Sequence, residues 1–313
     1  ARGRRAGPFR RAGPVRRGGP VMNRSWLFVP GDSLRKFERA TSGDADALIL
    51  DLEDSVAPQN KAQARGLTRE MLERPRAGKQ RFVRVNALDT GLTLDDLAAV
   101  VPAGPDGVVL PKCSSRDDLR RLAQYLDAFE TAAGLPLGGI RILAIATETA
   151  QSLFRLGDYA GATPRLCGLM WGAEDLSASL GASGNRESGR YHEPYRLARN
   201  LCLAGAAAAG VDAVDTVHVD IDDLDGLRAD ALAARRDGFA GKAVIHPKHV
   251  DVVNQAFLPG DDEVAHARRV VAAFEESAGT GVAKLDGKMV DQPHLVAARK
   301  ILALAARLPA RGR

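Results

Sequence analysis

The sequence has few cysteines and no long apolar run, and both absences narrow the class of protein. The three cysteines among 313 residues, Cys113, Cys167 and Cys202, are odd in number, far apart and without a CxxC pair. This spacing argues against a disulfide framework and against a zinc site, and we expect a reducing, cytoplasmic environment. No uncharged apolar run approaches the roughly 18–20 residues that span a bilayer, so we expect no membrane segment.

Acidic residues are missing from residues 1–21, which hold seven arginines. The formal charge of +5 arises there, because removing these arginines leaves 37 basic and 39 acidic residues. A Gly-, Pro- and Arg-rich segment with so few apolar residues cannot offset its ordering entropy. We therefore predict that residues 1–22 are a disordered extension, upstream of a natural start at Met22. The alternative is an arm that binds nucleic acid, but the near-neutral body carries no recognised reader motif.

The body of the chain, residues 23–258, alternates short β-type runs with longer amphipathic ones, as βα units around a parallel sheet do. The eight expected strands are residues 25–30, 46–52, 81–86, 106–112, 141–147, 165–172, 213–219 and 242–247. An α/β TIM barrel has this number of repeats and needs about 250 residues. A doubly wound open sheet is the alternative, but the GxGxxG that usually follows its first strand is missing from VPGDSLRK, residues 29–36.

The pattern changes after Phe257. Residues 261–278 and 293–307 are predicted helices that flank a loop, and we expect no strand among them. Residues 259–310 are therefore predicted to form a helical C-terminal appendage, which covers the barrel or reaches a neighbouring subunit.

Polar residues gather where the expected strands end. They are Asp51, Glu53, Asp54, Arg84, Asn86, Lys112, Glu148, Glu174, Asp175 and His246. Because barrel active sites form at the carboxyl ends of the strands, these residues predict one shared mouth. Structural alternatives remain for several of them: Asp54 and His246 are also typical helix caps, and Arg84 also suits an ion pair. Lys242 begins its strand and is expected to be structural.

Glu148 and Asp175 follow two successive strands, so their side chains are expected to be neighbours. Mg²⁺ prefers oxygen ligands and is usually held by one or two carboxylates together with substrate oxygens and water. The guanidinium of Arg84 can bind a carboxylate through two hydrogen bonds. These three residues therefore form a candidate site for a divalent cation and an anionic substrate.

Several motifs together resemble a known family. They are RSWLFVPGDSLRKFERA, DALILDLEDSVAPQNKAQAR, RVNALDTGL, VVLPK, ETAQSL, WGAEDLSASLGA, GFAGKAVIHPKHVDVVNQAF and DGKMVDQP, in that order from Arg24 to about residue 305. They are similar to those of the citrate lyase beta subunit-like family in the HpcH/HpaI aldolase/citrate lyase superfamily, which includes citramalyl-CoA lyase and malyl-CoA lyase. The resemblance implies a TIM barrel that cleaves or forms a carbon–carbon bond between a CoA thioester enolate and a 2-oxo acid.

The resemblance also implies roles for individual residues. Glu148 and Asp175 would ligate Mg²⁺, with Mn²⁺ as a possible substitute, and Arg84 would bind the oxo-acid carboxylate. Glu53 and Asp54 would contact metal-bound water. A metal that binds the substrate hydroxyl lowers its pKa, which favours cleavage.

The remaining roles concern CoA and the neighbouring subunit. Asp291, in the C-terminal segment, would enter a neighbouring subunit's site as the acid that protonates the enolate, which implies a homo-oligomer, expected to be a trimer. Arg24 and Lys36 would contact CoA phosphates near the start of the first helix.

Alternative activities remain open. One is hydrolysis of a malyl-CoA-type thioester. Another is a Schiff-base aldolase in which Lys112 is the nucleophile. The sequence leaves open whether the released acid is glyoxylate, pyruvate or oxaloacetate, and whether the acyl carrier is free CoA or a carrier protein.

Overall fold

The computed structural model describes residues 23–277 and 281–307. The arginine-rich segment 1–22 lies outside the described residues, so its predicted disorder stays a prediction. Within the described ranges, no helix is both long and apolar enough to cross a membrane.

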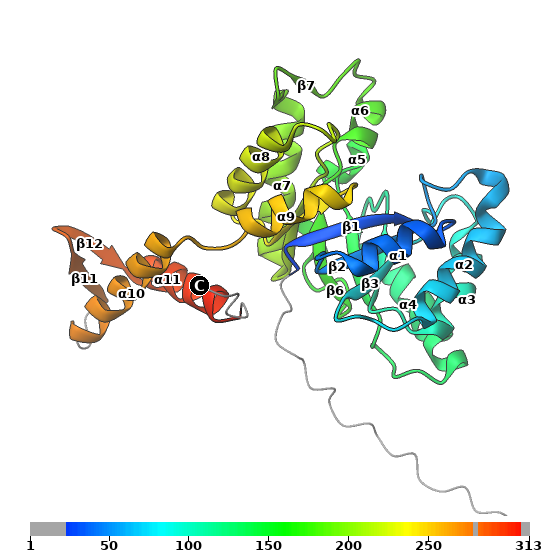
Figure 1. Cartoon of the computed structure of the whole chain (residues 1–313), viewed down its shortest axis with the longest axis horizontal. Helices are drawn as coiled ribbons and strands as arrows, with labels where there is room; N and C mark the ends of the chain where they lie inside the picture. Colours follow the sequence, from blue (N-terminus) through cyan, green and yellow to red (C-terminus); the bar gives the residue numbers. More distant parts are fainter. Residues whose placement is uncertain (1–22, 278–280, 308–313) are drawn as a thin grey trace, which may run out of the picture.

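Eight parallel strands close into a barrel (Figure 1). They are β1 (Ser25–Pro30), β2 (Ala47–Asp51), β3 (Gln80–Arg84), β4 (Gly107–Leu110), β5 (Arg141–Ile145), β6 (Leu166–Met170), β9 (Asp212–Asp215) and β10 (Gly241–Val244). Their order around the barrel is β1-β10-β9-β6-β5-β4-β3-β2, so every strand pairs with its successor and β10 returns to β1. All eight expected strands are present and the TIM barrel is confirmed.

Helices surround the barrel. They are α1 (Leu34–Ser42), α2 (Lys61–Glu73), α3 (Thr93–Val100), α4 (Arg116–Ala133), α5 (Ala150–Leu153), α6 (Glu174–Leu180), α7 (Glu193–Ala209), α8 (Leu224–Asp237) and α9 (Pro247–Ala256). Short 3₁₀ turns at Pro58–Asn60, Val101–Ala103 and Leu156–Tyr159 complete the connections. The N-caps match the sequence: Ser33 caps α1, and Ser115 forms a capping box with Asp118 at the start of α4.

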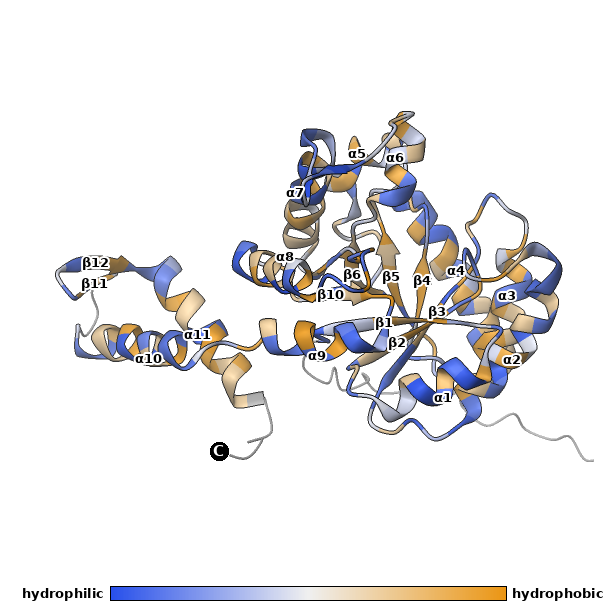
Figure 2. Ribbon diagram, turned by 45° about the horizontal axis from the view of Figure 1, so that its top comes forward, coloured by the Kyte–Doolittle hydropathy of each residue, from blue (hydrophilic) through white to orange (hydrophobic). Residues whose placement is uncertain are grey.

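Successive side chains of a strand point to opposite faces of the sheet, so the apolar strand residues form two separate layers. One set of strand residues packs against the helices, and Figure 2 shows the apolar strands β4 and β5 in the middle of the molecule. The other set fills the barrel interior: Trp26, Ala47, Ile49, Phe82, Val109, Leu143, Ile145, Met170, Val214 and Ala243. The interior is tightly filled, because a Cβ on Gly107 would lie 2.1 Å from the ring of Phe82.

The C-terminal segment differs from the prediction in one respect. Between α10 (Asp261–Glu276) and α11 (Gln292–Arg307) the chain forms a hairpin of β11 (Val282–Leu285) and β12 (Lys288–Asp291), where a loop without strands was expected. The turn contains Asp286 and Gly287, both with positive φ, which is the Asp-Gly signature of a two-residue hairpin. A second short hairpin, β7 (Arg186–Glu187) with β8 (Arg190–Tyr191), precedes α7.

The appendage formed by α10, β11, β12 and α11 extends away from the barrel (Figure 1). It has a small apolar cluster of its own, which includes Ala267, Val270 and Ala298. Near its base, Arg235 of α8 forms an ion pair of 2.7 Å with Glu263.

Candidate active site

Arg84 is held by Asp51 across two neighbouring strands. The two residues are in register at the ends of β2 and β3, and Arg84 donates from Nε and Nη2 to the two carboxylate oxygens of Asp51, each at 2.7 Å. Asp51 also accepts the backbone N–H groups of Glu53 and Ser55. Burial raises the pKa of Asp51, but the hydrogen bonds and charge of Arg84 outweigh it and lower that pKa overall.

The geometry leaves only part of the Arg84 guanidinium for a substrate. Its Nε edge is occupied by Asp51, and Nη1 lies 3.0 Å from Oε2 of Glu53 and 3.5 Å from Asp54. The group also lies 4.9 Å from the ring of Phe28. A substrate carboxylate can therefore reach Arg84 only at its outer Nη edge.

Lys112 lies at the centre of the acidic residues. Its Nζ donates to Oε1 of Glu53 at 2.5 Å and lies 3.3 Å from Oδ1 of Asp175, and its backbone N–H donates to Glu148. Lys112 has a φ of 51°, a conformation that a non-glycine residue rarely adopts, and this turn directs its N–H toward Glu148. One lysine thus brings three carboxylates together.

Glu148 is buried against a glycine. The chain after β6 passes so close that a Cβ on Gly172 would lie 2.8 Å from Cγ of Glu148. Burial, and then the charge of Asp175, raise the pKa of Glu148 to about 8. The two carboxylates therefore repel each other in a poorly solvated place, and a cation between them would relieve that repulsion.

These residues fit a divalent cation. Oε2 of Glu53 is buried and has no hydrogen-bond partner, although Arg84 is within ion-pair distance. Among the described residues, no group of three or more His, Cys, Asp or Glu side chains forms a complete ligand set. Glu148 and Asp175 could supply the one or two carboxylates that Mg²⁺ typically takes from protein.

The carboxylates open onto a cavity of about 400 Å³ at the barrel mouth. It is lined by Phe28, Pro30, Asp51, Asp54, Ser55, Arg84, Ile145, Glu148, Met170, Trp171, Gly172, Ala173, Glu174, Asp175, Thr216, Val217 and Ile245. The lining combines apolar side chains with the acids and Arg84, as suits a small anionic substrate attached to a longer chain.

The two residues expected at CoA lie at opposite ends of the barrel. Lys36 lines a second cavity of about 340 Å³, which shares Phe28, Pro30 and Ile245 with the mouth. Arg24 precedes β1, at the amino ends of the strands, and makes an ion pair with Asp46 through two hydrogen bonds. The structure does not bring Arg24 to this site, because a residue at a strand's start lies on the face opposite the mouth.

Asp291 also lies away from the mouth of its own barrel. It ends β12 in the appendage and pairs with His294 at 2.5 Å. Within the described residues, the lining of the mouth contains no residue of the appendage.

Several other candidates have structural partners. Asn86 donates to Asp96 and to a backbone carbonyl, and Nδ1 of His246 accepts the N–H of Lys248 at the start of α9. Lys242 is fully buried and forms an ion pair of 2.7 Å with Asp215. The capping interpretation of His246 and the structural interpretation of Lys242 agree with these contacts.

Sequence reasoning missed two parts of the site. Asp51 was expected as one more acid at the mouth. It does line the mouth, but it is also the buried partner of Arg84. The sequence could have indicated this pair, because the two residues stand near the ends of neighbouring expected strands, where they are in register. The bridging position of Lys112 depends on its positive φ, which the sequence Pro-Lys-Cys does not indicate.

Comparison with known proteins identifies the family of this chain. The model of the family described as HpcH/HpaI aldolase/citrate lyase matches residues 24–247. A (3S)-malyl-CoA thioesterase of Cereibacter sphaeroides is 39% identical over 296 residues, covering 92% of this chain and 96% of that protein. Citrate lyase subunit beta of Escherichia coli is 38% identical over 285 residues, covering 90% and 93%.

A solved structure has the same architecture. CitE from Mycobacterium tuberculosis, crystallised with magnesium, acetoacetate and coenzyme A, superposes with a TM-score of 0.77 at 35% identity, covering 92% of this chain and all of that one. The extent of both kinds of match shows that this chain belongs to the HpcH/HpaI aldolase/citrate lyase family of enzymes.

Proposed function

We propose that this protein is a Mg²⁺-dependent carbon–carbon lyase that cleaves, or forms, a 3-hydroxyacyl-CoA thioester. The observation that carries the proposal is the placing of Glu148 and Asp175 around one lysine beside Arg84, at the mouth of the barrel. Malyl-CoA, citramalyl-CoA and citryl-CoA are the candidate substrates, and acetyl-CoA and a 2-oxo acid are the products.

Each residue has a distinct task in this proposal. Glu148 and Asp175 would hold Mg²⁺, or Mn²⁺ in its place, and the cation would take over the contact that Lys112 makes with Asp175 at 3.3 Å. The bound ion supplies Lewis-acid stabilisation of negative charge on oxygen. Arg84, fixed by Asp51, binds the oxo-acid carboxylate with its outer Nη edge. Glu53 and Asp54 accept hydrogen bonds from water at the ion.

Asp291 completes the site from a neighbouring copy. The appendage extends away from its own barrel (Figure 1). Met289, in β12, is 70% exposed, and Val296, in α11, is 53% exposed. Large exposed apolar side chains of this kind favour contact with another subunit. Asp291 would protonate the thioester enolate there, in a homo-oligomer that we expect to be a trimer.

The CoA chain leaves the mouth through the cavity that Lys36 lines. Arg35, Lys36 and Arg39 give this cavity a positive charge, and it adjoins the mouth, with which it shares Phe28 and Ile245. Cations at the start of α1 suit the phosphates of CoA. Arg24 lies at the opposite end of the barrel and is not part of this subsite. The cytoplasmic location stays a prediction.

Hydrolysis of the thioester is a second candidate, because relatives at 39–40% identity are named (3S)-malyl-CoA thioesterase. The Schiff-base alternative is less favourable. Burial lowers the pKa of Lys112, but Glu53, Glu148 and Asp175 raise it well above its usual range, so the amine stays protonated and is a poor nucleophile.

The test is incubation of the protein with each of the three thioesters and Mg²⁺, with separate assays for 2-oxo acid and free CoA. A lyase releases oxo acid with acetyl-CoA, whereas a thioesterase releases free CoA without oxo acid. EDTA should abolish oxo-acid formation and excess Mg²⁺ should restore it. Undiminished cleavage in EDTA, or free CoA as the sole product, would refute the lyase proposal.

A further inference from the structure

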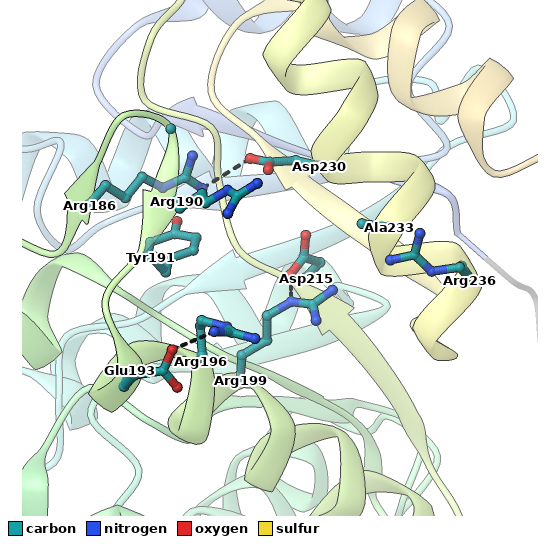
Figure 3. Close-up of a pocket in the computed structure, with 11 residues that line it drawn as sticks. Arg186, Arg190, Tyr191, Glu193, Arg196, Arg199, Asp215, Asp230, Ala233 and Arg236 are labelled. Atoms are coloured by element: carbon teal, nitrogen blue, oxygen red, sulfur yellow. Dashed lines mark hydrogen bonds and ion pairs between the residues drawn. The ribbon is translucent and has the colours of Figure 1, made fainter.

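A third cavity, rich in arginine, lies between α7, α8 and the β7–β8 hairpin (Figure 3). Its volume is about 590 Å³. Five arginines line it: Arg186 and Arg190 from the hairpin, Arg196 and Arg199 from α7, and Arg236 from α8. Their side chains approach from three sides, with Asp215 between them (Figure 3).

This cavity is separate from the active site. Val214 of β9 belongs to the packed barrel interior, so the next residue, Asp215, faces outward toward the helices. None of the residues that line the arginine cavity lines the mouth, among the residues that the structure describes. The two cavities therefore have separate linings.

Positive charge exceeds negative charge in the lining. Its three acids are Glu193, Asp215 and Asp230, against five arginines. The charge of Asp215 is moreover compensated by the buried Lys242, whose Nζ lies 2.7 Å from Oδ2 of Asp215. Arg190 has no side-chain partner in the part of the chain that the structure describes, so its charge faces the cavity uncompensated.

The inner arginines are held in place and the outer ones are accessible. Arg186 stacks on Tyr191 at 3.7 Å and pairs with Asp230 at 3.0 Å. Arg199 pairs with Asp237 at 2.8 Å, and its side chain is only 15% exposed. The side chain of Arg236, by contrast, is 76% exposed. Fixed inner guanidinium groups and exposed outer ones thus line a recess that an anion can enter.

We propose that this cavity binds a small anion that carries phosphate groups. Guanidinium groups donate paired hydrogen bonds that match phosphate oxygens, and several of them from three directions suit an ion with many oxygens and more than one charge. A diphosphate group, free or as part of a nucleotide, is the chemistry that this arrangement recognises.

Contacts of Asp215 link the arginine cavity to the active site. Oδ1 of Asp215 accepts from Nε1 of Trp171 at 2.6 Å and lies 3.3 Å from Nε of Arg199. Trp171 forms part of the wall of the mouth. Negative charge placed beside Arg199 therefore changes the electrostatic environment of Asp215 and of the Trp171 indole, and binding should change the tryptophan fluorescence.

The test is calorimetric and fluorescence titration of the full chain with inorganic pyrophosphate. We expect Arg190→Ala/Arg236→Ala to weaken binding by about tenfold or more, because charge-assisted hydrogen bonds are lost. The matched control is Arg69→Ala/Arg120→Ala, which removes the same charge from exposed helix positions elsewhere and should bind as the wild type does. Both substituted pairs are exposed, so folding should be retained, which thermal unfolding will verify.

The proposal would be overturned by no binding of pyrophosphate or by equal weakening in the control. Weakening by Lys36→Ala in place of the cavity variant would also overturn it, because it would assign the binding to the CoA subsite. Tighter binding of citrate than of pyrophosphate would also overturn it, in favour of a carboxylate site. Adenosine diphosphate is a further arm: tighter binding than pyrophosphate identifies a nucleotide as the source of the phosphate groups, and equal or weaker binding identifies the free anion. The lyase assay is independent of all these arms.

Discussion

At the scale of single residues, the pair of Asp51 and Arg84 sets the geometry of the site. The Asp51 side chain is 2% exposed and that of Arg84 is 11% exposed, so both charges are largely removed from water. An ion pair in such a place depends on both partners, because the remaining charge is left buried when one is lost.

We predict that Asp51→Asn destabilises the protein by about 3 kcal/mol, within the range for breaking a buried ion pair, and abolishes binding of the oxo acid. Urea unfolding measures the first effect and calorimetry with the oxo acid the second. Asp54→Asn is the matched control, since Asp54 lies 3.5 Å from Arg84 but its side chain is 57% exposed; it should change stability by less than about 0.5 kcal/mol. Equal effects of the two substitutions would refute this role for Asp51.

Glu148 gives a prediction about pH. Its pKa is raised to about 8 from 4.5, so between these values the folded chain keeps a proton that the unfolded chain has lost. Stability conferred by that proton falls as pH rises through this window, by up to about 1.4 kcal/mol per pH unit. Glu148→Gln cannot titrate, so its stability should fall less steeply with pH in the presence of EDTA.

Chemical unfolding at a series of pH values measures this slope. Asp117→Asn, a substitution of an exposed acid on α4, is the control and should keep the wild-type slope. Identical slopes for Glu148→Gln and the wild type would show that Glu148 is already ionised at low pH.

At the scale of secondary structure, periodicity and composition predicted most of the fold. Each barrel strand is a short apolar run and each outer helix has a polar and an apolar face, so local patterns suffice to find them. The β11–β12 hairpin was missed because its strands have only four residues each, and helices adjoin them on both sides. Its Asp286-Gly287 turn was the signal that could have indicated it.

This hairpin carries the third prediction. Gly287 has a φ of 77°, and a β-branched side chain there costs on the order of 1–3 kcal/mol. Gly287→Val should therefore open the hairpin to proteolysis and reduce oxo-acid formation, while thermal unfolding of the barrel is unchanged. Gly281→Val is the control, because its backbone has no positive φ and space is open around it. Normal activity in a chain with an open hairpin would remove Asp291 from the mechanism.

At the scale of the whole molecule, the sites depend on contacts that no local pattern encodes. The arginine cavity joins a hairpin and two helices, and nothing in the sequence distinguishes its arginines from ordinary surface residues. The placement of Arg24 likewise follows from the direction of β1 in the closed barrel, which puts it at the face opposite the mouth. The rim acids were predictable because barrel topology alone brings successive strand ends together.

The assembly carries the fourth prediction. If Asp291 serves a neighbouring subunit, Glu148→Ala and Asp291→Asn chains are each inactive alone, but mixed oligomers contain sites with an intact barrel and an intact appendage. Unfolding and refolding the two variants together should therefore restore oxo-acid formation that neither shows alone. Each variant refolded by itself is the control, and a mixture that stays inactive would contradict donation across the subunit boundary.

The central claim is that Glu148 and Asp175 together hold one divalent cation at the barrel mouth. Its most direct measurement is calorimetric titration of the metal-free protein with Mg²⁺, in parallel with Glu148→Gln, Asp175→Asn and the control Asp117→Asn. We predict one site per chain in the wild type and in the control, and no measurable binding in either of the other two. Unchanged Mg²⁺ affinity in both Glu148→Gln and Asp175→Asn would contradict the account.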